Sequence, residues 1–89
     1  MNLSKEEKLE IFSKFGNSTT DTGSVKGQIA MFTERINRLT EHLKEHSKDF
    51  STRLGLLKLV GKRRRLLNYL MKKDIDAYRS LIAELGIRK

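Results

Sequence analysis

The side chains best suited to chemistry gather between residues 51 and 73, in a stretch that is apolar and strongly basic at once and contains no proline. Wound as a helix, at about 100° per residue, this stretch places its leucines on one side and a row of cations on the other. Lysine and arginine neutralise phosphates, and an exposed tyrosine stacks on a base. We therefore expect this helix to lie along a nucleic-acid backbone. Its cationic stripe consists of Lys58, Gly61, Lys62, Arg65, Tyr69 and Lys72.

Two alternatives apply to this stripe. A charged helix face commonly serves only to keep a protein in solution, but this face has no acidic residue at helical spacing to balance it. Tyrosine on a helix is commonly half-buried packing, but Tyr69 lies between Arg65 and Lys72, away from the leucines, which favours stacking on a base or sugar. Arg63 and Arg64 fall at the apolar side, where we expect their stems to follow neighbouring helices and their charged heads to reach water.

The two histidines, His42 and His46, have the i, i+4 spacing of two metal ligands on one helix, and Asp49 could supply a third. No zinc-protease motif surrounds them, so surface polar groups at a helix end are the favoured interpretation. The chain also lacks cysteine, a Ser/His/Asp constellation and a glycine-rich phosphate loop. We therefore predict no enzyme, no cofactor and no metal site.

The positive charge is concentrated in the second half of the chain. The net charge is +8, yet residues 1–50 carry equal numbers of acidic and basic side chains, and residues 51–89 carry the whole excess. This asymmetry indicates a polyanionic partner, most commonly nucleic acid. No apolar run approaches 18 residues, and the first residues have neither a secretion nor a transit pattern. We expect a cytoplasmic protein without a membrane segment.

Residues 1–89 are short enough for a single domain, and their periodicity predicts an all-α fold of four helices. The first helix is expected at about 4–15, with a Ser4/Glu7 capping box and a small apolar face that includes Leu9 and Ile11. A polar loop, 16–23, tethers it, so we expect it to be mobile. The other expected helices are a long antiparallel pair at about 25–46 and 52–72, and a C-terminal helix that begins after Asp74 and packs on the pair.

The long helix at 25–46 has an apolar seam with strict heptad spacing. Because the helix at 52–72 supplies a partner within the same chain, we expect a monomer and not a coiled-coil dimer, although a dimeric adaptor stays possible at this point. The seam residues are Val25, Ile29, Phe32, Ile36, Leu39 and Leu43.

Several short motifs together resemble one family along the full chain, the bacterial small-subunit ribosomal protein S15 family. The motifs are Phe15-Gly16, Asp21-Thr22-Gly23-Ser24 with Gln28, Arg35-Ile36-Asn37-Arg38-Leu39, His42 with His46, Gly55-Leu56-Leu57, Arg63-Arg64-Arg65-Leu66-Leu67-Asn68-Tyr69-Leu70 and Leu85-Gly86-Ile87-Arg88.

The resemblance implies a structural constituent of the ribosome that binds 16S rRNA directly. Such a protein holds a three-way junction of the central domain, nucleates assembly of the platform beside neighbouring small-subunit proteins, and bridges to 23S rRNA of the large subunit. By the family pattern, the junction is held by Thr22, Gly23, Gln28, Arg35, Arg65, Tyr69 and Lys72, and the cationic stripe adds Lys58 and Lys62.

A second RNA site is also implied by the resemblance, at a shallow minor groove near a G·U pair. It would use His42, Asp49 and the hydroxyl of Thr52. Here the chain departs from the family pattern His-Ser-Arg-Arg-Gly, because it has Ser51-Thr52-Arg53-Leu54-Gly55. A basic helical DNA-binding protein, of the nucleoid or helix-turn-helix kind, remains the alternative to an rRNA binder.

Overall fold

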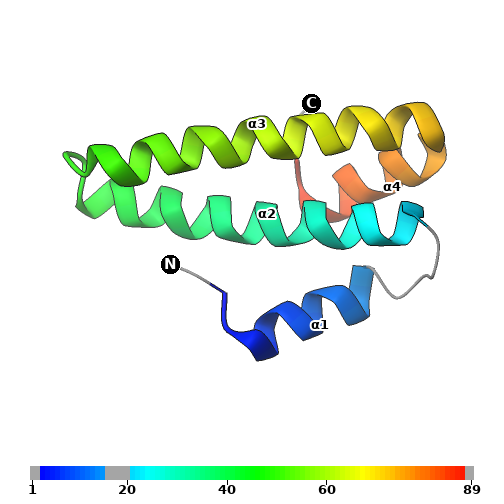
Figure 1. Cartoon of the computed structure of the whole chain (residues 1–89), viewed down its shortest axis with the longest axis horizontal. Helices are drawn as coiled ribbons and strands as arrows, with labels where there is room; N and C mark the ends of the chain where they lie inside the picture. Colours follow the sequence, from blue (N-terminus) through cyan, green and yellow to red (C-terminus); the bar gives the residue numbers. More distant parts are fainter. Residues whose placement is uncertain (1–2, 16–20, 88–89) are drawn as a thin grey trace.

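The chain folds into four helices in a computed structural model that describes residues 3–15 and 21–87, and those residues contain no strand (Figure 1). This confirms the predicted all-α class. No helix in these two ranges is both long and apolar enough to cross a bilayer. The helices are α1 (Lys5–Phe15), α2 (Asp21–Glu45), α3 (Phe50–Lys73) and α4 (Ile75–Leu85).

The long helices α2 and α3 lie antiparallel and side by side, as the short turn between them requires (Figure 1). The heptad seam of α2 packs against α3 of the same chain, with Val25, Ile29 and Ile36 buried. Ile29 and Leu70 are fully buried and form the centre of the core. Truncating either to alanine would cost about 2–5 kcal/mol of folding free energy.

The helix α2 begins at Asp21, so the predicted loop at 16–23 is wrong for its last three residues. Residues 16–20 lie outside the described residues. A hydroxyl-rich sequence is typical of a loop, but Ser, Thr and Asp are also favoured at the start of a helix, where backbone N–H groups need acceptors. In this chain the polar residues from Asp21 onward therefore form the first turn of α2.

The first helix, α1, runs antiparallel to α2 and contacts only that helix among those described (Figure 1). The Ser4/Glu7 capping box forms, because the Glu7 N–H donates to Ser4 Oγ and the Ser4 N–H donates to Glu7 Oε1. Leu9 is 63% exposed, so its predicted place on the apolar face is wrong. Leu9 and Ile11 are about 200° apart on a helix and cannot share a face. Whether α1 moves remains a prediction.

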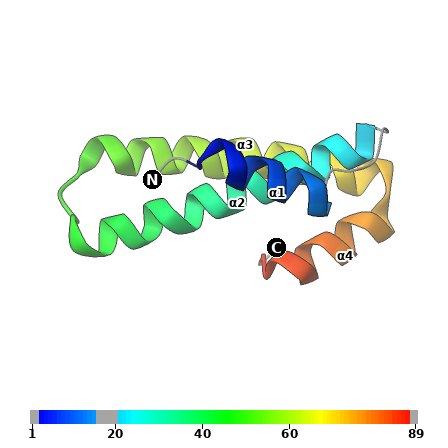
Figure 2. The ribbon, with the colours of Figure 1, turned by 90° about the horizontal axis from the view of Figure 1, so that it is seen from below.

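The last helix, α4, lies against the C-terminal half of α3 and the start of α2 (Figure 2). Asp74 is its N-cap, as predicted, and accepts from the Ala77 N–H at 3.1 Å. Gly86 ends it in the left-handed conformation, with φ 67°, which glycine adopts without a steric penalty. Tyr78 and Leu81 are buried against the α2–α3 pair and complete the core.

Candidate nucleic-acid interface

The predicted cationic stripe lies on the exposed side of α3. Its four cations, Lys58, Lys62, Arg65 and Lys72, are all exposed, and none forms an ion pair within the described part of the chain. Tyr69 is 38% exposed, and Lys73 Nζ lies 5.7 Å from the centre of its ring, within cation–π distance. The stripe therefore combines unneutralised charge with an accessible aromatic ring.

Gln28 of α2 lies across from this stripe and joins the two helices into one surface. With Ser24, Leu66 and Tyr69 it lines one shallow hollow, and with Lys62 and Arg65 it lines the next. The Gln28 amide donates to Ser24 Oγ at 3.4 Å, near the upper limit of a hydrogen bond. Because this bond is weak, the amide can turn toward another partner at little cost in free energy. The structure thus brings together Gln28, Lys62, Arg65 and Tyr69, which are up to 41 positions apart in the sequence.

The remaining residues that were predicted to hold the junction extend this surface in both directions. Arg35 is half-buried on α2, two turns beyond Gln28, and Lys58 and Lys72 lie toward opposite ends of α3. Thr22 and Gly23 belong to the first turn of α2, and the structure describes only their backbone. The surface therefore follows the length of the α2–α3 pair.

A second cluster lies at the other end of the pair, where α2 turns into α3. Asp49 is the N-cap of α3: its Oδ1 accepts from the Thr52 N–H at 3.1 Å, and its Oδ2 accepts from the Thr52 hydroxyl at 2.6 Å. His42 Nε2 lies 2.9 Å from the same Oδ2. The hydrogen bond from the Thr52 hydroxyl, followed by that from His42, lowers the pKa of Asp49 to about 2.

These contacts fix the tautomer of His42. The ionised Asp49 carboxylate only accepts hydrogen bonds, so His42 Nε2 donates to it, and in the corresponding neutral tautomer Nδ1 is the acceptor. The His46 ring lies with its centre 4.6 Å from that of His42, tilted by 31°. The described residues include no group of three His, Cys, Asp or Glu side chains that could hold a metal ion. Hydrogen bonds from His42 and Thr52 to Asp49 hold the cluster together.

Sequence reasoning missed one contact of the helix pair. Arg63 does not simply extend into water: its Nη1 donates to Thr33 Oγ1 at 3.2 Å, and the buried Thr33 hydroxyl donates to the Ile29 carbonyl at 2.8 Å. Burial lowers the pKa of Arg63. In the sequence, only the position of Arg63 inside the apolar arc of α3 indicated that it is partly buried. Its partner, Thr33, could not be predicted, because that contact depends on the register between α2 and α3.

Comparison with known proteins identifies the family. The sequence profile of the family described as ribosomal protein S15 matches residues 8–88. The chain belongs to the ribosomal protein S15 family. The small ribosomal subunit protein uS15 of Fusobacterium nucleatum is 65% identical over 82 residues, which cover 92% of this chain and 96% of that protein. Those of Caldanaerobacter subterraneus and Chloroherpeton thalassium are 63% and 60% identical, over 98% and 100% of this chain and 99% and 100% of the relatives.

Membership of the S15 family confirms the resemblance recognised from the motifs. S15-family proteins are structural and not enzymatic, as was predicted from the absence of a catalytic constellation. The most basic helix of this ribosomal protein is α3, which carries eight Lys and Arg side chains and no Asp or Glu.

Proposed function

We propose that this chain is a primary 16S rRNA-binding protein of the small ribosomal subunit that holds a three-way helical junction. The observation that carries the proposal is the gathering of Gln28, Lys62, Arg65 and Tyr69 on one surface across α2 and α3, in a chain of a ribosomal protein family. Long parallel rows of groups suit the backbones of two RNA helices that meet at a junction.

Each group in this surface has a distinct task. Lys58, Lys62, Arg65 and Lys72 neutralise phosphates and release counterions, which supplies most of the affinity. The Tyr69 ring stacks on a nucleotide that the junction leaves unpaired, and the Gln28 amide hydrogen-bonds a base or ribose. Because these groups stand on two packed helices, they are held in register before RNA arrives.

The cluster of His42, Asp49 and Thr52 is proposed to read a minor groove near a G·U pair. The minor groove of A-form RNA is wide and shallow and exposes 2′-hydroxyls and base edges. His42 Nδ1 would accept from a guanine N2 amino group or a 2′-hydroxyl, and Asp49 keeps the ring in that orientation. Threonine at position 52 keeps the hydroxyl that the family pattern has there, and this hydroxyl is already bonded to Asp49.

Two consequences for the ribosome complete the proposal. Holding the junction from two sites would order the RNA of the platform early, so that neighbouring small-subunit proteins can bind. A further face of the small protein would then reach 23S rRNA and form an intersubunit bridge. The place of the protein in the cell is accordingly the ribosome, where it acts as a single chain and uses no cofactor.

The test compares a three-way-junction RNA with an unbranched RNA duplex and a DNA duplex of equal charge. We expect the junction to be bound most tightly, and Tyr69→Ala to weaken that binding by about 1–3 kcal/mol, the usual worth of base–aromatic stacking. Arg79→Gln, at an exposed position of α4, is the matched control and should change affinity little. Equal binding to all three nucleic acids would overturn the junction proposal and favour a general DNA- or RNA-binding protein.

A further inference from the structure

The outward side of α3 carries a ridge of large apolar side chains that the cationic stripe does not include. Phe50, Leu54 and Leu57 are 72%, 55% and 64% exposed, and Val60 is 38% exposed. Their spacing of four, three and three residues places them within an arc of about 120° on the helix. Isolated exposed leucines need no explanation, but a contiguous row of four marks an interaction surface. We call these four residues the apolar ridge.

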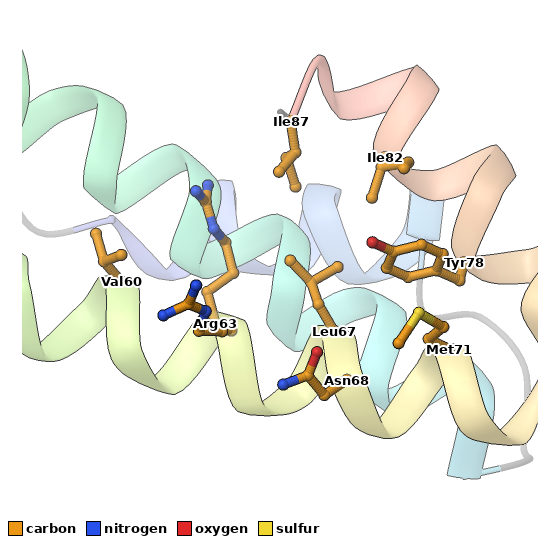
Figure 3. A pocket seen from close by; sticks show the side chains of 9 residues that line it. Val60, Arg63, Leu67, Asn68, Met71, Tyr78, Ile82 and Ile87 are labelled. Atoms are coloured by element: carbon orange, nitrogen blue, oxygen red, sulfur yellow. The ribbon is translucent and has the colours of Figure 1, made fainter. Parts of the chain in front are cut away.

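The ridge continues into a hollow between α3 and α4 with a volume of about 440 Å³. Figure 3 shows Tyr78, Ile82 and Ile87 of the α4 side facing Val60 and Leu67 of α3 across this hollow. Two guanidinium groups, those of Arg63 and Arg64, also line it. An apolar cavity with cations at its wall suits a ligand that is apolar and carries a carboxylate.

The charges around the ridge select among possible occupants. The whole of α3 has no Asp or Glu, and Arg53 and Arg64, which lie on the same side of the helix as the ridge, form no ion pair among the described residues. A second copy of this chain would bring like charges together, which is unfavourable. RNA is disfavoured as well, because the ridge side chains offer no hydrogen-bond donor to phosphate or base edges.

We propose that the apolar ridge and the hollow bind an amphipathic helix of a neighbouring small-subunit protein whose apolar face is bordered by Asp or Glu. Anchors at i, i+4 and i+7 are typical of helix-to-helix recognition. From Phe50 to Leu67 the surface spans 18 residues of α3, or about 25 Å, the length of roughly five helical turns. Apolar side chains of the partner pack on Leu54 and Leu57, and its carboxylates pair with Arg64 and Arg63.

This inference rests on the proposed place in the small subunit but not on the RNA contacts. The test inserts a benzophenone amino acid at position 57 and, as the matched control, at position 9, whose leucine is 63% exposed on α1. Purified small subunits that contain either variant are irradiated, and cross-linked peptides are identified by mass spectrometry. Position 57 should cross-link a helical segment of another subunit protein, and the apolar face of that segment should be bordered by Asp or Glu. Cross-links to rRNA, to a second copy, or at no higher yield than from position 9 would overturn the proposal.

A charge reversal tests the second half of the surface. Combined with the probe at position 57, Arg64→Glu should reduce the yield of the protein cross-link by at least about fivefold, as expected when a desolvated interfacial charge is reversed. Arg79→Glu on α4, outside the surface, is the matched control and should leave the yield unchanged. Binding of Leu57→Ser to the junction RNA should equal that of the wild type, which separates failure of this proposal from failure of the RNA proposal. An unchanged yield with Arg64→Glu would overturn the acidic partner.

Discussion

His42 Nε2 of α2 and Asp49 Oδ2 lie 2.9 Å apart across the turn that joins α2 to α3. The same carboxylate accepts two hydrogen bonds from Thr52 at the start of α3. One carboxylate therefore orients the histidine and caps the helix at once. As a result, the groups proposed to read the minor groove are arranged before RNA binds.

The pH dependence of stability should report this carboxylate. The pKa of Asp49 is lowered from 3.8 to about 2, so its contribution is complete above pH 4 and is lost as the pH falls through about 2. Asp49→Asn keeps an N-cap side chain but does not titrate. The difference in unfolding free energy between wild type and Asp49→Asn, measured by urea denaturation, should therefore shrink from pH 5 to pH 2. A difference that stays constant over this range would contradict the assignment.

The hydroxyl of Thr52 should matter more than its methyl group. Thr52→Val removes the 2.6 Å hydrogen bond to Asp49 while keeping the shape of the side chain, and Thr52→Ser keeps the hydroxyl. We expect Thr52→Val to weaken binding to RNA that contains the G·U minor-groove site by about tenfold, as for a lost hydrogen bond to a charged group. Thr52→Ser should bind like the wild type, in filter-binding or calorimetric titrations. Equal weakening by the two changes would assign the effect to packing.

The salt dependence of RNA binding should count the phosphates that the stripe neutralises. Four exposed cations, Lys58, Lys62, Arg65 and Lys72, predict that log affinity falls with log salt at a slope of about −3 or steeper. Arg65→Gln should make the slope shallower by about one unit, whereas Tyr69→Ala should leave it almost unchanged. Titrations at several salt concentrations measure both. A slope near zero for the wild type would exclude phosphate tracking.

Removal of residues 1–15 should leave most RNA affinity intact, because the helix α1 contributes no residue to either proposed RNA site. Its described contacts are with α2 and include the ion pair between Glu7 and Arg38, which lowers the pKa of Glu7 to about 2. Hydrogen exchange of the free protein should show less protection in α1 than in α2 and α3. A loss of binding beyond about 3 kcal/mol on truncation, more than one or two contacts supply, would contradict the prediction.

Periodicity predicted the helices and much of the core correctly, because burial of Ile29 and Leu70 depends only on which side of a helix a residue occupies. The contact of Arg63 with Thr33 could not be predicted in this way, since it depends on the axial register of α2 against α3. The start of α2 at Asp21 was missed because polar residues occur both in loops and in first helical turns. The role of Tyr69 in RNA binding stays a prediction.

Gln28 and His42 belong to the same helix and are separated by 14 residues, or about 21 Å. The backbone hydrogen bonds of α2 fix this spacing, so the two proposed RNA sites stand at a set distance from each other. If both proposed sites bind RNA, occupation of one presents the other to its target at a high effective concentration, and two modest contacts would give strong avidity. An RNA whose two sites have a different spacing loses this gain even when both sequences are intact. The distance between the two proposed sites could thus distinguish correctly folded from wrongly folded rRNA.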